Sequence, residues 1–132
     1  MPASGDTISV IIPLYNRAEE IGRAIASALR QSHAPHEIVV VDDCSPDGSA
    51  AAVAALRNPR IRLLRHERNR GGAAARNTGI AAATGDWIAR LDSDDEWEPE
   101  KRVRQLAALR AGPDAPAAAS VTGYVIRDYR TG

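Results

Sequence analysis

The segment EIVVVDD, at residues 37–43, decides the fold. Four apolar residues follow one another in it without the polar alternation of a half-exposed strand, and two aspartates end it. Such an uninterrupted apolar run is typical of a parallel strand that is covered on both faces. We therefore expect a parallel sheet between layers of helices, with two carboxylates at the tip of one strand.

Segments of strand-like and helix-like pattern alternate on both sides of this run. Asn16 and Glu19 fit a capping box, so the first helix is expected to begin at Asn16. Pro99 suits the first turn of the last helix. The expected strands are residues 7–13, 37–43, 61–66 and 86–91, with a fifth at 120–126 after a loop at 111–119, and the expected helices are residues 16–31, 49–58, 71–85 and one that starts near Pro99.

This alternation predicts a doubly wound α/β sheet whose crossovers are right-handed. In such sheets, ligands bind beyond the carboxyl ends of the strands. The loops expected there carry PLYNR (13–17), VDDCS (41–45), RHERNRGG (65–72) and LDSDD (91–95). Residues that are far apart in the sequence should therefore share one rim.

Composition limits the class of protein. The chain has 132 residues, 44% of them apolar, which suits one domain with a sizeable core. Its 17 basic and 17 acidic residues balance, so no overall field would draw it to nucleic acid or to an anionic membrane. Cys44 is the only cysteine, which favours a reducing compartment. No apolar run approaches the ~18 residues of a membrane span. We expect a cytoplasmic protein, with peripheral contact at the inner face of the membrane left open.

Charge is nevertheless segregated along the chain. Seven arginines fall between residues 57 and 76 with Glu67 as the only acid among them, and six acids follow in RLDSDDEWEPE at residues 90–100. A solvated face is the usual explanation of such runs. The alternative is that the two clusters meet around an anion and its metal.

Two pairs of aspartates are the main candidates for a site. Asp92 and Asp94 flank Ser93 just beyond a predicted strand, and their oxygens suit magnesium or manganese, which keep positions open for substrate phosphates. A solvated turn is the more frequent explanation of an isolated Asp-x-Asp, but the position at a strand tip favours a site. Asp42 and Asp43 end another strand on the same rim, where they could serve turn chemistry or hydrogen-bond a nucleotide.

Other residues admit two interpretations. Arg76 could cover an apolar surface, or reach phosphate or base with its planar fork of donors. Tyr15 could pack in the core or lie against a nucleobase. Trp87 and Trp97 are interpreted as packing residues, and the three histidines as surface or hydrogen-bonded side chains.

Several common sites are excluded. No G-x-G-x-x-G follows the first strand and no P-loop occurs. The acidic segment lacks the glycine and the terminal glutamate of an EF-hand. Zinc lacks the clusters of cysteine and histidine that it needs.

Four segments in register resemble the family 2 glycosyltransferases of GT-A fold. They are SVIIPLYNR (9–17), EIVVVDDCSPDGS (37–49), NRGGAAARNTGIAAATGDWIARLDSDDEW (69–97) and EPEKRVRQL (98–106). The resemblance implies a Rossmann-like, doubly wound, mostly parallel sheet with flanking helices. It also implies that residues 1–132 are a single nucleotide-sugar-binding domain, with a core at about 7–126, and the N-terminal part of a longer, here truncated, glycosyltransferase.

The resemblance implies roles for five residues that would bind the nucleotide sugar. Pro13 and Tyr15 match the loop that contacts the nucleobase. Asp43 matches the acid that hydrogen-bonds the base, and Asp42 lies beside it. Arg76 matches the basic residue near the base and the diphosphate.

Residues 92–94 match the DXD motif of that family. The match implies that Asp94 ligates a divalent cation, Mn²⁺ or Mg²⁺, that Asp92 lies near the ribose or the metal, and that Ser93 belongs to the nucleotide-sugar site. The donor would be a nucleotide-diphosphate sugar, with a UDP-sugar as the leading expectation. The acceptor would be a glycan or a lipid-linked molecule, and the reaction an inverting displacement.

Two departures from the family pattern stand out. Cys44 occupies a position where the family commonly has glycine. The general base of the family lies downstream in an acceptor-binding half, and Asp128 lies too near the nucleotide half to serve. The alternative hypothesis is a nucleotide-binding module without turnover of its own.

Overall fold

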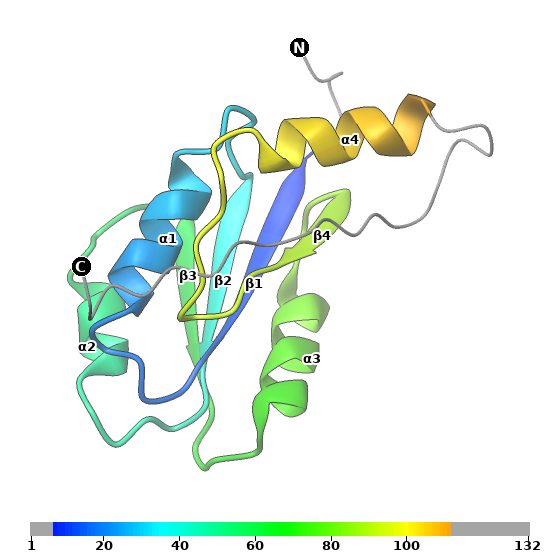
Figure 1. The fold of residues 1–132 in the computed structure, drawn as a ribbon. Helices are drawn as coiled ribbons and strands as arrows, with labels where there is room; N and C mark the ends of the chain where they lie inside the picture. Colours follow the sequence, from blue (N-terminus) through cyan, green and yellow to red (C-terminus); the bar gives the residue numbers. More distant parts are fainter. Residues whose placement is uncertain (1–6, 112–132) are drawn as a thin grey trace.

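A computed structural model of the protein describes residues 7–111. In this range the chain forms one four-stranded sheet, in which every pairing is parallel and the strand order is β3-β2-β1-β4 (Figure 1). The predicted doubly wound α/β fold is thus confirmed. The elements in chain order are β1 (Ile8–Leu14), α1 (Ile21–Leu29), β2 (Glu37–Asp42), α2 (Ser49–Ala54), β3 (Ile61–Arg65), α3 (Gly72–Ala82), β4 (Trp87–Arg90) and α4 (Lys101–Ala111).

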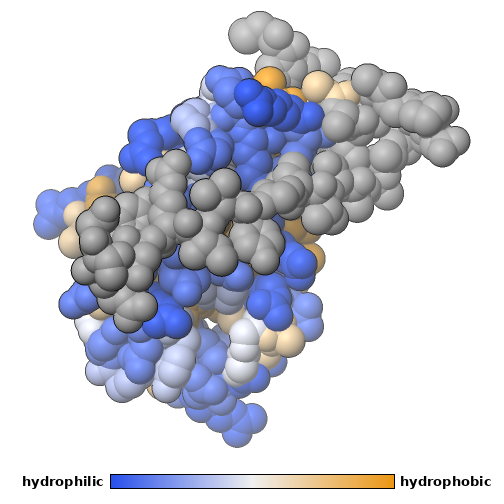
Figure 2. Space-filling model, viewed as in Figure 1, coloured by the Kyte–Doolittle hydropathy of each residue, from blue (hydrophilic) through white to orange (hydrophobic). Residues whose placement is uncertain are grey.

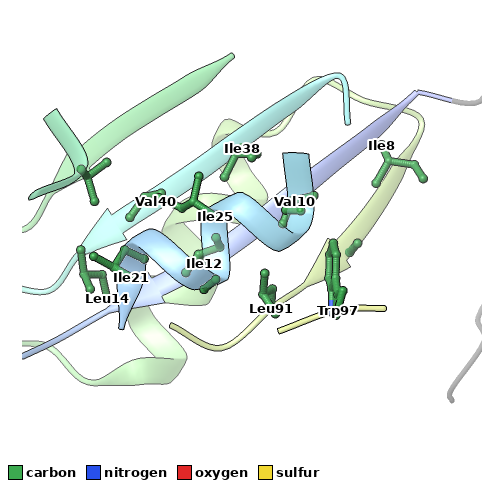
Figure 3. Packing of buried hydrophobic residues seen from close by; sticks show 14 of the residues in the cluster. Ile8, Val10, Ile12, Leu14, Ile21, Ile25, Ile38, Val40, Leu91 and Trp97 are labelled. Carbon is green, nitrogen blue, oxygen red and sulfur yellow. The ribbon is translucent and has the colours of Figure 1, made fainter. Parts of the chain in front are cut away.

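Helices cover both faces of the sheet. β1 is central, so its side chains alternate between two buried clusters. One cluster joins the sheet to α1, α2 and α4, and α1 lies directly over the strands there (Figure 3). Trp97 belongs to this cluster and Trp87 packs against it, which confirms both as packing residues. The smaller cluster, formed by Ile11, Val39, Val41 and Ala75, joins the other face to α3.

α3 approaches the sheet closely through a glycine. A Cβ atom built on Gly79 would lie 2.5 Å from Cγ2 of Ile11 and 3.3 Å from Cγ2 of Val41. Real Cβ atoms do not come this close to a neighbour, so the backbone of α3 lies where only glycine fits.

The first helix starts later than predicted. The capping box at Asn16 and Glu19 is wrong: α1 begins at Ile21, and Glu20 caps it without a side-chain hydrogen bond. Asn16 has a positive φ of 55°, which an N-cap residue does not adopt. The loop instead binds to the segment after β2, because the backbone N–H of Asn16 donates to the hydroxyl of Ser45 and that of Arg17 donates to the hydroxyl of Ser49, the first residue of α2.

The other predicted boundaries agree to within four residues. The largest difference is that α2 ends four residues early, and the last helix starts at Lys101, two residues after Pro99. α3 stops at Ala82 because the N–H groups that follow are held by the sheet: Thr84 donates to Glu37 and Gly85 donates to the hydroxyl of Ser9. The predicted strand at 120–126 and most of the loop before it lie outside the described residues.

Replacement of Gly79 by alanine should destabilise the protein by about 2 kcal/mol, because the new methyl group overpacks the contact with Ile11. Urea denaturation measures the loss. Gly22→Ala is the matched control, since Gly22 lies in α1 and a Cβ atom added to it would meet no atom within 4 Å. That variant should be neutral or stabilised by up to about 1 kcal/mol. Equal losses in the two variants would contradict the close approach.

Glu37 ties the amino end of β2 to three other segments, namely β1, β3 and the turn after α3. It is buried, and its carboxylate accepts hydrogen bonds from the hydroxyl of Ser9, from the N–H and hydroxyl of Thr84, and from Arg62. Burial raises the pKa of Glu37, but these hydrogen bonds outweigh burial and bring the pKa down from 4.5 to about 2. The folded state therefore favours the ionised form.

Because the folded pKa of Glu37 lies below the unfolded pKa, its contribution to stability is complete above pH 4.5 and is lost as the pH falls towards 2. Glu37→Gln should cost about 2 kcal/mol at neutral pH. Its free energy of unfolding should then fall less steeply than that of the wild type between pH 4.5 and 2. Urea titrations across this range test both points, with the exposed Glu19→Gln as control. A wild-type acid profile in Glu37→Gln would refute this role.

Candidate functional site

A cavity opens where the direction of the sheet reverses. The chain first runs outward from β1 to β3 and then crosses back to β4 on the other side of β1, which leaves a crevice at the carboxyl ends. These ends lie towards the bottom of Figure 1. The cavity has a volume of about 240 Å³ and is lined by Pro13, Leu14, Tyr15, Arg17, Asp43, Gly72, Ala75, Asp92, Ser93 and Asp94.

Six of the eight predicted site residues line this cavity. They come from the end of β1 with the loop after it, and from the loops after β2 and β4, so the fold assembles them from three separate parts of the sequence. Tyr15 is exposed, as its loop position suggested. The roles that the family resemblance gives to these residues remain predictions.

Asp42 does not line the cavity. It is completely buried, and its carboxylate accepts hydrogen bonds from both the N–H and the hydroxyl of Ser45. Nε of Arg65 lies 3.2 Å from its Oδ2 atom. These contacts make Asp42 an organiser of the turn after β2, in line with the turn chemistry considered for it.

Arg76 is half-buried on α3 and also lies outside the cavity lining. Its Nη1 atom lies 3.6 Å from the point where a Cβ atom of Gly72 would be. Because Gly72 does line the cavity, the guanidinium of Arg76 lies at its edge.

Asp43 is both a cavity residue and an anchor. Its Oδ1 atom accepts from the imidazole of His66 at 2.7 Å and from the N–H of Arg70 at 2.8 Å, and its Oδ2 atom accepts from the N–H of Gly71 at 2.8 Å. Burial raises the pKa of Asp43, but these donors lower it by more, so the group stays ionised. A carboxylate has about four acceptor positions, so one remains for a further donor.

Gly71 makes this anchor possible. Its φ of 96° lies in the left-handed region that favours glycine. The conformation brings two successive N–H groups, those of Arg70 and Gly71, onto one carboxylate and starts α3 at the next residue.

His66 was not predicted as a site residue, although hydrogen bonding was one of the interpretations of the histidines. It is buried, with Nδ1 on Asp43 and Nε2 at 2.8 Å from the hydroxyl of Thr78. A proton on Nδ1 donates to the carboxylate of Asp43, and the hydroxyl of Thr78 completes the contact at Nε2. His66 therefore connects the tip of β2 to α3, and its position at the end of a strand on the rim was the available signal.

The Asp92–Asp94 segment is held at both ends. The N–H of Leu91 still donates to Ile11 of β1 at 3.0 Å, and the chain then turns. Beyond the turn, the N–H of Trp97 donates to the hydroxyl of Ser27 in α1. Asp92 and Asp94 are exposed between these anchors, whereas Ser93 is buried.

The acids of this segment repel one another. Burial raises the pKa of Asp95, and the charges of Asp94 and Asp92 raise it further. Nη2 of Arg17 lies 3.8 Å from Oδ2 of Asp94. Arg17 is the third residue after β1, in the rim loop, and this position could have identified it from the sequence.

The arginine-rich segment does not meet these acids in the cavity. None of its seven arginines lines the cavity. Three are held elsewhere: Arg60 donates to the carbonyl of Pro35, Arg62 pairs with Glu37, and Arg65 pairs with Asp42. The segment as a whole therefore does not converge on the acids, although one of its members, Arg76, lies at the edge of the cavity.

The carboxylates that line the cavity suit a divalent cation whose remaining ligands come from a bound phosphate and water. Asp92 and Asp94 offer hard carboxylate oxygens to the cavity. Within residues 7–111 no group of three or more His, Cys, Asp or Glu side chains could hold a metal ion. Mg²⁺ and Mn²⁺ are commonly bound by one or two carboxylates, with substrate phosphates and water as the other ligands. The residues thus fit a metal that the ligand completes.

Cys44 keeps the backbone shape that suits glycine. Its φ is 61°, in the left-handed region, and its thiol donates weakly to the carbonyl of Glu67 at 3.6 Å. The departure from the family pattern therefore leaves the turn in place, at a cost of about 1 kcal/mol.

The coloured surface in Figure 2 is mainly hydrophilic, with small hydrophobic areas. The large apolar residues that are exposed, Tyr15, Leu56, Ile80 and Ile88, come from different elements. Among the described residues, no helix has the length and apolar character to cross a membrane.

Comparison with known proteins adds a family. Residues 9–131 match the model of the family described as Glycosyl transferase family 2. The chain is 50% identical over 99 residues to the succinoglycan biosynthesis protein ExoO of Rhizobium meliloti (strain 1021). The aligned residues cover 75% of this chain and 28% of that protein.

Two solved structures share the fold. The S. aureus TarS 1-349 complex with UDP-GlcNAc superposes with a TM-score of 0.71 at 33% identity, over 78% of this chain and 31% of that one. The mannosyltransferase PcManGT from Pyrobaculum calidifontis, in complex with GDP-Man and Mn²⁺, gives a TM-score of 0.69 at 32% identity, over 80% and 32%. The chain spans roughly a third of the length of each of these proteins.

Replacement of His66 by alanine should destabilise the protein by about 2 kcal/mol, because Asp43 loses a charge-assisted hydrogen bond in a buried setting. His66→Asn keeps a donor near the position of Nδ1 but loses the contact with Thr78. It should therefore lose only about 1 kcal/mol. Urea denaturation of both variants measures this order, and equal losses would show that bulk rather than the hydrogen bond matters.

Proposed function

The chain belongs to glycosyl transferase family 2, and from this premise we propose that it binds the donor of a metal-assisted, inverting glycosyltransferase. The donor is a nucleotide-diphosphate sugar, with a UDP-sugar as the first candidate. One observation carries the proposal: the fold brings Tyr15, Asp43, Asp92 and Asp94 from three separate loops into one cavity.

The nucleoside end of the donor would lie between the loops after β1 and β2. Pro13 and Tyr15 supply apolar and aromatic surface against the base. Asp43 is ionised and has an acceptor position left, so it can take an N–H of the base. Arg76, at the edge of the cavity, would meet the base or the diphosphate.

The diphosphate end would lie towards Asp92, Ser93 and Asp94. Asp94 would hold the divalent cation, and Asp92 would share it or contact the ribose. A divalent cation neutralises the charge that develops on the departing diphosphate. The part of this chain is to hold Asp92 and Asp94 on an anchored segment beside the nucleoside.

Sugar transfer needs a second set of groups. An acceptor hydroxyl must attack the anomeric carbon from the face opposite the diphosphate, and a carboxylate must take its proton. We assign no residue of this chain to that role. The acceptor, a glycan or a lipid-linked molecule, would be bound by other parts of the whole enzyme.

Two structural relatives support the donor class. TarS 1-349 was solved in complex with UDP-GlcNAc, and PcManGT in complex with GDP-Man and Mn²⁺. Their sequences are 33% and 32% identical to that of this chain. The two donors carry different nucleobases, so together they support the class of nucleotide-diphosphate sugars.

Asp94→Ala should abolish the part of nucleotide binding that depends on metal, whereas Asp43→Ala should weaken binding with or without metal. The reason is that the two carboxylates serve different ends of the ligand. Calorimetry with UDP, GDP and TDP, each with Mn²⁺ and with EDTA, measures both effects and identifies the base. Asp86→Ala, which removes an exposed acid outside the cavity, is the control.

The same titrations decide between the two hypotheses. Binding without transfer or hydrolysis of a sugar by this chain would favour a binding module over a self-sufficient enzyme. No binding of any of the three nucleotides, with or without metal, would refute the proposed donor site. Identical behaviour of the Asp94 and Asp43 variants would refute their separate roles.

A further inference from the structure

Arg17 is the only cationic side chain that lines the cavity within residues 7–111. The other charged residues of the lining are Asp43, Asp92 and Asp94. A nucleoside diphosphate would bring more negative charge into this acidic space. Apart from a bound metal, the side chain of Arg17 is thus the counter-charge that the described chain places in the cavity itself.

The backbone of Arg17 is held by hydrogen bonds, whereas its side chain is half exposed. The N–H of Arg17 donates to the hydroxyl of Ser49 at 3.0 Å, and its carbonyl accepts from the N–H groups of Glu20 and Ile21, at the start of α1. Its side chain is 47% exposed and lies 3.8 Å from Asp94, which is 51% exposed. A well-anchored residue therefore carries a guanidinium with room to move.

The pair with Asp94 is weak enough to exchange. Exposed ion pairs at this distance contribute little to stability, because water screens them. The pair of Arg65 with Asp42 is different, since Nε lies 3.2 Å from a fully buried carboxylate. Arg65 thus belongs to a structural ion pair, whereas Arg17, the cavity arginine, belongs to a weak and exposed ion pair.

We infer that Arg17 is an exchangeable counter-ion of the site. Without ligand it neutralises Asp94, and when the donor binds with its metal it releases Asp94 to the metal and pairs with the diphosphate. This inference rests on the proposed function. It makes Arg17 a ligand-positioning residue and not merely a stabilising ion pair.

The exchange predicts effects of opposite sign. For a metal ion alone, Arg17 is a competitor for Asp94, so its loss should strengthen binding. For a nucleoside diphosphate alone, Arg17 is a partner, so its loss should weaken binding. A side chain that only stabilised the fold would not move the two affinities in opposite directions.

Arg17→Gln is the test variant, measured at low ionic strength where exposed charges are least screened. Binding of Mn²⁺ alone is followed by the electron paramagnetic resonance of free Mn²⁺ and should tighten about twofold to fivefold. Binding of UDP or GDP in EDTA, whichever the wild type binds, is followed by calorimetry and should weaken about tenfold. The matching nucleoside, which lacks the diphosphate, should bind Arg17→Gln as it binds the wild type.

Arg23→Gln is the matched control. Arg23 pairs with Glu96 at 3.1 Å, so this variant removes the same charge near the acidic segment but outside the cavity. If both variants change Mn²⁺ affinity equally, the loss of any positive charge near the acidic segment explains the change. The inference is then overturned. The inference is also overturned if Arg17→Gln weakens the binding of the nucleoside as much as the binding of the nucleoside diphosphate.

The failure of this inference is distinct from the failure of the proposed function. A wild-type chain that binds a nucleoside diphosphate with Mn²⁺, together with an Arg17→Gln variant that behaves like Arg23→Gln, overturns only the role of Arg17. A wild-type chain that binds no nucleoside diphosphate overturns the proposed function and the exchange together.

Discussion

The parallel pairing of β1 with β2 on one side and β4 on the other is the constraint on which the rest of the structure depends. Parallel neighbours need crossover connections, so every loop that follows a strand emerges at the same end of the sheet. The loops after β1, β2 and β4 thereby meet, and the reversal of strand order beside β1 leaves the space between them. The apolar runs that fill the two core clusters thus decide where the polar residues lie.

The fold assigns different work to the same residue type through burial. Asp42 and Asp43 are adjacent, but Asp42 is enclosed by Ser45 and Arg65, whereas Asp43 anchors the loop before α3 and still faces the cavity. Asp92 and Asp94 stay exposed and repel a third acid, Asp95. Carboxylates with fixed donors lose little by being buried. Exposed ones keep the capacity to bind a cation.

These differences mark the limit of inference from the sequence. The order of the elements and the placement of acids on the rim followed from uninterrupted apolar runs, because burial on both faces leaves a strong pattern. Whether Asp42 or Asp43 faces the cavity depends on the turn geometry after β2, where Cys44 takes a positive φ. The false capping box at Asn16 has a similar cause, since contacts from the neighbouring loop overrode the local signal.

Arg17 and His66 were missed for a further reason: their partners are distant in the sequence. Asp94 is 77 residues from Arg17, and Asp43 is 23 residues from His66. Their positions after strands were a signal, but the partner of each residue is decided only when the rim is assembled. The arginine-rich segment shows the converse, because a conspicuous local cluster was dispersed into separate structural contacts.

The rim combines a braced backbone with exposed charges. N–H groups of the loop after β1 bind the loop after β2, and Asp43 binds the loop after β3, so three loops hold one another without a ligand. The Asp92–Asp94 segment is tied to β1 and to α1 instead. Ordering loops on binding costs free energy, and here that cost has already been met in folding. What a ligand must still arrange is confined to exposed side chains, chiefly those of Tyr15, Arg17, Asp92 and Asp94. Selectivity at this rim should therefore depend on how charge is exchanged among these side chains more than on closure of a loop.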